Sequence, residues 1–287
     1  MAVVSTGFFD GVHLGHRQVL QTLVSSARER GEEAIVVTFA QHPRAVLQQD
    51  ARTLRLLNSP QEKEALLRAL GVDRVVALPF DRAFARMTAA EYIREVLVGR
   101  FGATALVLGY DNRLGSDKLG PDGVGALARS LGLDVIVVPP QTGPVAGNFV
   151  SSTKIREALE QGRVEDAEGM LGYAYMLRGV VVGGKQLGRT IGFPTANLRL
   201  YDPLKLVPAR GVYLTEVEVL DDHYWGMTNV GDIIETHIFD FDEDIYGLDL
   251  EIRFRRHLRE MRNFESLDAL KAQLVADEEA CRALLRS

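Results

Sequence analysis

The chain opens with a short apolar run, a glycine-bearing turn and a helical pattern, and this combination constrains the fold most. The apolar run covers residues 2–4, and the turn reads Gly7-Phe8-Phe9-Asp10-Gly11-Val12-His13-Leu14-Gly15-His16. Apolar residues then recur at helical spacing from Val19 until Gly31. A turn that opens a helix presents free backbone N–H groups and a positive dipole end, which favour a bound polyphosphate. The opening therefore predicts a strand, a phosphate-binding turn and a helix.

Two histidines, His13 and His16, end this turn at a His-x-Gly-His spacing. An imidazole N–H at this place can hydrogen-bond phosphate oxygens and stabilise charge that grows in a transition state. Asp10 can orient the loop or help to hold a metal ion. The alternative interpretation of these residues is a tight strand-to-helix turn with surface histidines.

The first half of the chain alternates apolar runs with helical patterns. Apolar runs typical of buried parallel strands cover residues 34–39, 72–80, 105–108 and 135–138. Ser59-Pro60-Gln61-Glu62 and Thr88-Ala89-Ala90-Glu91 are capping boxes that start two of the helices. This alternation predicts a parallel α/β sheet.

Polar side chains follow the predicted strands at the end where such a sheet binds ligands. Thr38 and His42 lie at the end of one run, and Gly109, Asp111 and Asn112 follow another. His42 alone is equally well explained as an ordinary loop histidine.

A last polar motif of this half, Val150-Ser151-Ser152-Thr153-Lys154-Ile155-Arg156, stands at the start of a helix. Its hydroxyls are explained by an N-cap. Arg156, one turn into the helix, could reach a phosphate bound at the helix start.

These motifs occur in one order, and together they resemble the adenylyltransferase module of the bacterial bifunctional riboflavin kinases/FMN adenylyltransferases, also called FAD synthetases. The motifs are the His-x-Gly-His turn, Thr-Phe-x-x-His-Pro, Gly-Tyr-Asp and Ser-Ser-Thr-x-Ile-Arg, and the resemblance covers residues 3–170. It implies a nucleotidylyltransferase fold with a Rossmann-like parallel sheet, in which His13 and His16 are catalytic. The residues that it assigns to ATP are Gly7, Phe9, Asp10, Gly11, His13, His16, Gly109, Asp111, Ser152, Thr153 and Arg156. It assigns Thr38, His42 and Asn112 to the flavin. Phe8 stands where many relatives have asparagine, and Gln41 where many have proline.

The second half has a different sequence pattern, in which short runs of strand-forming residues are separated by turns rich in Gly, Asp and Asn. The runs cover residues 177–182, 213–220, 237–241 and 250–254, and a final helix begins near Ser266. This spacing predicts a small antiparallel barrel with a C-terminal helix.

A glycine-rich stretch from Gly184 to Asn197 carries the chemistry of this half. Glycines at this density let backbone approach a phosphate chain closely. Thr195 and Asn197 point to one side of an extended segment, and their oxygens suit Mg²⁺, which binds through few protein groups plus phosphates. The alternative is a glycine-rich hairpin with a polar edge.

This stretch and three later segments resemble the riboflavin kinase domain of the same family. The segments are Gly211-Val212-Tyr213, Thr228-Asn229-Val230-Gly231 and Glu235-Thr236-His237. The resemblance implies that Thr195 and Asn197 hold Mg²⁺–ATP and that Glu235 is the base acting on the ribityl hydroxyl of riboflavin. The kinase residues that it assigns to ATP are Gly184, Gly188, Arg189, Gly192, Pro194, Thr195 and Asn197.

One departure concerns the connection between Gly231 and Glu235. Relatives usually carry a longer loop with an Arg-Pro-Thr element there. Either this chain lacks the loop, which would leave an FMN adenylyltransferase with a non-catalytic flavin-binding barrel, or a mobile segment is missing from the sequence. The intact flanking motifs favour the second explanation.

Length, charge and cysteine content bound the remaining expectations. We expect two domains over residues 1–170 and 171–287, acting on riboflavin, FMN and ATP with Mg²⁺ and yielding FMN and FAD. A net charge of −6 argues against nucleic-acid and anionic-membrane partners. The single cysteine, Cys281, excludes an internal disulfide and a cysteine-based zinc site. No span-length apolar run and no signal peptide is recognisable, so we expect a cytoplasmic enzyme. Weak association into a homo-oligomer is a separate possibility that the sequence leaves open. Because the chain begins almost at its first motif, we expect the natural protein to extend further at its N-terminus.

Overall fold

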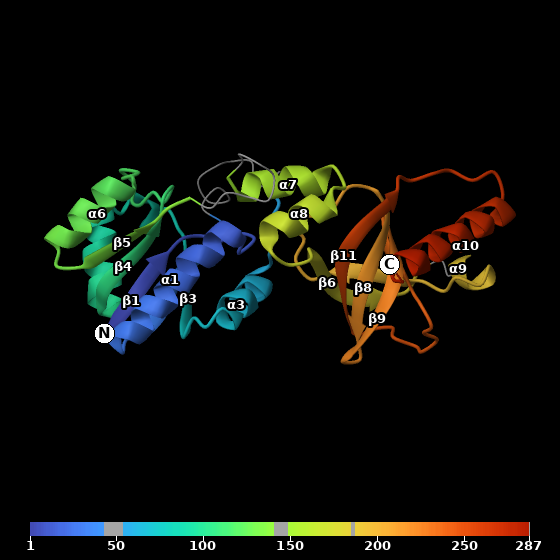
Figure 1. Ribbon diagram of the computed structural model, residues 1–287, viewed down its shortest axis with the longest axis horizontal. Helices are drawn as coiled ribbons and strands as arrows, with labels where there is room; N and C mark the ends of the chain where they lie inside the picture. Colours follow the sequence, from blue (N-terminus) through green and yellow to red (C-terminus); the bar gives the residue numbers. More distant parts are fainter. Residues whose placement is uncertain (43–53, 141–148, 185–186, 287) are drawn as a thin grey trace. The chain divides into compact units, whose positions relative to one another are not determined.

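The computed structural model describes residues 1–42, 54–140, 149–184 and 187–286. The chain divides into two compact units, Met1–Ser152 and Thr153–Ser287, and each is described by itself (Figure 1). Within the described ranges, no helix has the length and apolar character needed to span a bilayer.

A parallel five-stranded sheet in the order β3-β2-β1-β4-β5 forms the first unit. Its strands are β1 (Ala2–Thr6), β2 (Glu33–Phe39), β3 (Arg74–Leu78), β4 (Ala103–Gly109) and β5 (Asp134–Val138). Its helical elements are α1 (Leu14–Arg30), α3 (Pro60–Ala69), η2 (Phe84–Arg86), the continuous stretch α4 (Ala89–Glu91), η3 (Tyr92–Val98) and α5 (Gly99–Phe101), and α6 (Pro121–Ser130). The predicted parallel α/β fold is confirmed.

Helices cover both faces of this sheet, which explains why its central strands are apolar at successive positions. On one face, Leu23 of α1 and Leu67 of α3 pack on the sheet. On the other face, Ile93 of η3 and Val124 of α6 do so. These four side chains are fully buried, and burying a side chain of this kind stabilises a fold by about 1.5–3 kcal/mol.

Local signals in the sequence set the ends of these helices. The predicted capping boxes at Ser59 and Thr88 are both present, and α1 ends at Gly31 in a left-handed conformation with φ 64°. The strand order reverses between β1 and β4, so the carboxyl ends of these two strands flank the position where such sheets bind ligands.

A closed antiparallel barrel in the order β10-β7-β6-β11-β8-β9 forms the second unit, as predicted. Its strands are β6 (Met176–Val182), β7 (Ala196–Leu200), β8 (Gly211–Val219), β9 (Asp222–Val230), β10 (Ile234–Ile238) and β11 (Asp249–Arg259). The accompanying helices are α7 (Ser152–Glu160), α8 (Val164–Leu171), α9 (Leu187–Thr190) and α10 (Leu267–Leu284). Figure 1 shows α10 lying alongside the barrel as a single long helix.

One prediction for the barrel needs correction. The strand predicted over residues 237–241 ends at Ile238, because Asp240 turns the chain with a positive φ of 57°. The connection before this strand is a closed turn, in which the Gly231 N–H donates to the Ile233 carbonyl at 3.1 Å and Val230 pairs with Ile234. Whether a longer segment belongs between Gly231 and Glu235 stays a prediction.

Candidate active sites

The turn between β1 and α1 is strained. Phe9 and Val12 have positive φ angles of 54° and 37°, and Gly11 has 86°. Side chains rarely accept this region, at a cost of about 1–3 kcal/mol per residue, so the surroundings must enforce it.

Three residues predicted to bind ligands hold the backbone of this turn instead of standing free. The Thr38 hydroxyl donates to the Phe8 carbonyl at 3.2 Å. The Asn112 Nδ2 donates to the Thr6 carbonyl at 2.7 Å, and the Ser152 hydroxyl donates to the Asp10 carbonyl at 2.8 Å. Their side chains come from separate parts of the chain, so the turn is fixed by tertiary contacts.

Asp10 orients the loop, which is one of the two roles expected for it. The side chain is 5% exposed, and its Oδ1 accepts from the N–H groups of Leu57 at 3.0 Å and Asn58 at 3.3 Å. The described ranges hold no group of three or more His, Cys, Asp and Glu residues that could bind a metal.

The two predicted histidines face each other at the start of α1. Their rings stack with centroids 3.6 Å apart, and His13 Nδ1 accepts from the His16 N–H at 3.3 Å. Since Nδ1 is an acceptor, the proton of neutral His13 is on Nε2, where it can serve as a donor. Burial lowers the pKa of His13 to about 4. Burial, and then the charges of His13 and Lys63, lower the pKa of His16 as well. Both imidazoles are therefore neutral at pH 7.

The other residues predicted for this site differ in how they are placed. His42 packs its ring against Phe8 with centroids 4.4 Å apart, which brings its loop to the turn. A Cβ on Gly109 would meet only ordinary contacts at 3.6 Å, and Asp111 is exposed. Thr153 and Arg156 continue α7 in the second unit, so their part in this site stays a prediction. Pro43, which completes the predicted flavin loop, lies outside the described residues.

Sequence reasoning missed Lys63 of α3. Its Nζ donates to the Phe8 carbonyl and the Thr38 hydroxyl, each at 3.1 Å. The sequence predicted the helix correctly from its capping box, but nothing near Lys63 in the sequence marks it as different from other helical lysines.

The predicted residues of the barrel share one row across three strands. Glu235 of β10 pairs with Asn197 of β7 on one side and with Asn229 of β9 on the other. Directly opposite residues on antiparallel strands point to the same face, with Cβ atoms about 5 Å apart. Thr195 precedes Asn197 by two positions and contributes to the same cavity.

This cavity has a volume of ≈ 390 Å³, within the range of about 300–1,000 Å³ that is typical of ligand pockets. Besides Thr195, Asn197, Asn229 and Glu235, it is lined by residues that include Arg259, Met261 and Phe264. Arg259 is fixed by Asp277 of α10, with a 2.7 Å contact between Nη2 and Oδ2. Sequence reasoning assigned Asn229 and Arg259 no role.

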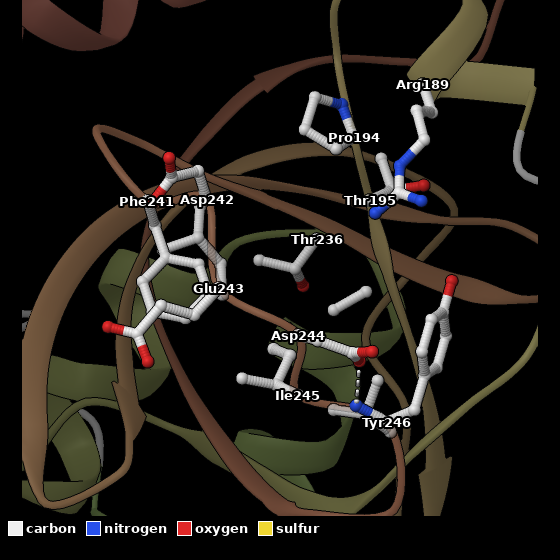
Figure 2. Close-up of a pocket in the computed structure, with 13 residues that line it drawn as sticks. Arg189, Pro194, Thr195, Thr236, Phe241, Asp242, Glu243, Asp244, Ile245 and Tyr246 are labelled. Carbon is white, nitrogen blue, oxygen red and sulfur yellow. Dashed lines mark hydrogen bonds between the residues drawn. The ribbon is translucent and has the colours of Figure 1, made fainter.

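A second cavity of ≈ 220 Å³ lies next to it. Figure 2 shows Arg189 and Thr195 on one side and Asp242 and Glu243 on the other. The backbone N–H of Tyr246 donates to Asp244 Oδ1 at 3.1 Å, and both residues line this cavity. Thr195 lines both cavities, so the two meet at this side chain.

Close packing requires two of the predicted glycines. A Cβ on Gly184 would lie 2.0 Å from Asn197 Nδ2, and one on Gly188 would lie 2.1 Å from the Phe193 carbonyl. The Asn197 Oδ1 is buried and has no hydrogen-bond partner among the described residues, so this oxygen is available to a cation. Gly192 has a φ of 90° and ends the turn before Pro194. Lys185 and Gln186 lie outside the described residues.

Comparison with known proteins identifies both units. Residues 1–154 match the family model described as FAD synthetase, and residues 171–285 match the one described as riboflavin kinase. The chain belongs to the bifunctional riboflavin kinase/FMN adenylyltransferase family. It is a transferase that phosphorylates riboflavin to FMN and adenylylates FMN to FAD, with ATP as the co-substrate.

Relatives support this assignment over nearly the whole chain. Bifunctional riboflavin kinase/FMN adenylyltransferases of Listeria monocytogenes and Escherichia coli are 34% and 36% identical, covering 98% of this chain and 91% of theirs. A crystal structure from Streptococcus pneumoniae, described as a macrolide-efflux protein, is 36% identical with a TM-score of 0.91, covering 98% of this chain and 93% of its own.

Proposed function

We propose that the two activities divide between the two units, with riboflavin phosphorylated in the barrel and FMN adenylylated at the His13–His16 turn. The observation that carries this division is the row of Asn197 and Glu235 beside Thr195, where the two cavities of the barrel meet. Phosphoryl transfer needs a donor and an acceptor in line, and two cavities joined at one side chain provide adjacent places for them.

In the barrel, we propose that riboflavin occupies the larger cavity and ATP the smaller one. Glu235 accepts the proton of the terminal ribityl hydroxyl as the γ-phosphoryl group transfers. Thr195 and the unpartnered oxygen of Asn197 would hold Mg²⁺, which takes oxygen ligands and keeps several positions for phosphates. Bound there, the ion neutralises charge on the phosphates of ATP. Gly184, Gly188, Arg189, Gly192 and Pro194 complete the proposed ATP site.

At the turn of the first unit, we propose that the FMN phosphate attacks the α-phosphorus of ATP. The new P–O bond forms as the bond to pyrophosphate breaks, and no covalent enzyme intermediate is needed. His13 and His16 act as neutral hydrogen-bond donors to the charge that develops on the phosphate oxygens. Gly7, Phe9, Gly11, Gly109, Asp111, Thr153 and Arg156 are the further proposed ATP contacts, and His42 is the proposed flavin contact. Asp10, Thr38, Asn112 and Ser152 support the site by holding its backbone in place.

We propose domain limits of residues 1–170 and 171–287, in line with the start of the riboflavin kinase match at residue 171. Because both reactions consume ATP, we propose a cytoplasmic location. The net charge of −6 supports a protein without nucleic-acid or membrane partners, and we propose at most weak self-association.

A product assay tests the division. Wild-type protein is incubated with ATP and Mg²⁺, starting from riboflavin in one reaction and from FMN in another, and the flavins are separated by chromatography. We expect FAD from both starting points. FAD from FMN alone would remove the kinase from the proposal and implicate the short turn at Gly231–Ile233. No FAD from either would contradict both assignments.

A further inference from the structure

Lys63 is a buried ammonium group beside the strained turn, and none of the motifs includes it. The residue is 6% exposed. Its Nζ binds the Phe8 carbonyl and the Thr38 hydroxyl at 3.1 Å each, and it lies 4.0 Å above the Phe8 ring. A lysine ammonium has three N–H donors, so one donor remains after these two bonds.

The charge of Lys63 has little compensation in the protein. Both of its acceptors are neutral, and no ion pair within 4.0 Å joins it to a carboxylate in the described part of the chain. The titratable groups that face it are Asp10 of the turn and His16 of α1. Burial lowers the pKa of Lys63 to about 8, against the attraction of Asp10. A buried cation without a partner is costly, and such groups concentrate at functional sites.

The position of Lys63 fits an anionic ligand. It connects the turn after β1 to Thr38 of β2, at the carboxyl edge where sheets of this type bind their ligands. His13 and His16 are neutral at this edge, so Lys63 adds positive charge where the polyphosphate of the proposed reaction would lie.

We propose that the third N–H of Lys63 binds a phosphate oxygen of ATP or of FMN during adenylyl transfer. This inference rests on the adenylyltransferase function proposed for the first unit. A charge-assisted bond from an ammonium to a phosphate is stronger than its bonds to a carbonyl and a hydroxyl, so substrate binding completes the coordination of Lys63.

Proton uptake on binding provides a readout that a structural lysine would not show. An anion beside Lys63 raises its pKa, so at pH 8 binding draws about half a proton from solution, since about half of the free protein is deprotonated there. At pH 6.5 the amine is already protonated, and this uptake disappears.

The first experiment is calorimetric titration of full-length wild type, Lys63→Met and Lys63→Arg, with ATP alone and with FMN alone. Measurements at pH 8 in two buffers of different ionisation enthalpy give the proton uptake. Binding of a nucleotide or flavin to the barrel adds the same proton uptake in all three proteins, so it cancels when the proteins are compared. We expect an excess uptake in wild type over both variants for one of the two ligands, which identifies the phosphate that Lys63 contacts. Equal uptake in wild type and Lys63→Met with both ligands would overturn the proposal.

The second experiment measures activity and stability. Lys63→Met should lower kcat/KM for FAD formation from FMN by about 10- to 100-fold, as expected for the loss of a hydrogen bond to a charged group. Lys63→Arg should recover most of this loss because it keeps the cation, and FMN formation should be unchanged in both variants. The unfolding midpoint of Lys63→Met should stay level or rise, because an apolar stem replaces a buried charge. A kcat/KM within about twofold of wild type would contradict the proposal, whereas absence of FAD formation in the wild type would contradict the proposed function instead.

Discussion

The proposed ATP sites, at the turn of the first unit and in the barrel of the second, are built by different structural means. In the turn, backbone strain at Phe9 and Val12 is held by hydrogen bonds from distant segments, and the candidate donors are neutral imidazoles. In the barrel, strand register alone brings Glu235 opposite Asn197. A site built on a loop therefore depends on hydrogen bonds from residues scattered through the chain, whereas a site built on strands depends on the pairing of adjacent strands.

Glu235→Gln in the barrel should give the largest effect. Loss of a general base lowers phosphoryl transfer by about 10²–10⁴-fold, because the amide cannot accept the hydroxyl proton. FMN formation from riboflavin should fall by this factor while FAD formation from FMN persists. The rates are read from separated flavins. Glu279→Gln on the exposed side of α10 is the matched control, and parallel loss of both activities would contradict the division between units.

His16→Ala tests the turn of the first unit. Removing one positioned donor costs about 10²–10³-fold in kcat, so FAD formation from FMN should be nearly abolished while FMN formation continues. His223→Ala serves as the control because His223 is exposed, with 69% of its side chain accessible. If the His16 variant retained FAD formation close to wild type, the imidazoles would have no catalytic role.

The pH dependence of stability should distinguish the two units, because the buried histidine pair lies in the first unit. The pKa of His13 falls from 6.5 to about 4 on folding. The unfolded state therefore binds more protons between these values, and stability is complete above pH 6.5 and is lost as the pH falls toward 4. Between pH 6.5 and 5, we expect the titration of His13 to lower the free energy of unfolding of the first unit by about 2 kcal/mol.

Chemical unfolding at several pH values, followed by circular dichroism in the wild type and the variant alike, measures this slope. A His13→Gln variant, in which this position cannot titrate, should make the slope shallower, and the remainder comes from His16, whose pKa burial also lowers. An unchanged slope in that variant would show that His13 is not the group responsible.

Glu168→Gln should give the smallest effect and test where the second unit begins. Glu168 and Glu165 of α8 pair with Arg255 and Arg256 of β11. Partly exposed pairs contribute about 0.2–1 kcal/mol, so unfolding of the barrel, followed by FMN formation, should be easier by about that amount. If unfolding of the first unit shifted instead, α8 would belong functionally to the adenylyltransferase.

Much of the fold was predictable because local signals and the tertiary structure agree. Buried runs of aliphatic residues gave the central strands, and Ser59, Thr88 and Gly31 fixed helix ends. The strands β7 and β9 were not predicted, since their polar residues, Asn197 and Asn229 among them, interrupt the apolar pattern. These interruptions are candidate site residues, so local rules failed where we propose that the reaction takes place.

For the candidate sites, only residues that belong to a sequence motif could be predicted. Motifs identified the histidines and Glu235, but they could not show that the side chains of Thr38 and Asn112 hydrogen-bond to backbone carbonyls of the turn. Lys63 and Arg259 have no local signature, because each acquires its environment from partners distant in sequence. Lys63 meets Phe8 across 55 positions, and Arg259 meets Asp277 across 18.

Thr195 lies where the two cavities of the barrel meet, and this position affects how the enzyme can diversify. With ATP and riboflavin placed in the two cavities as we propose, residues that line only one cavity, such as Tyr246 or Phe264, can vary to suit a new nucleotide or a new flavin without disturbing the other substrate. Thr195 has no such freedom, since any replacement changes both cavities at once. Selection for altered substrates should therefore leave Thr195 fixed and accumulate changes on the outer walls of each cavity.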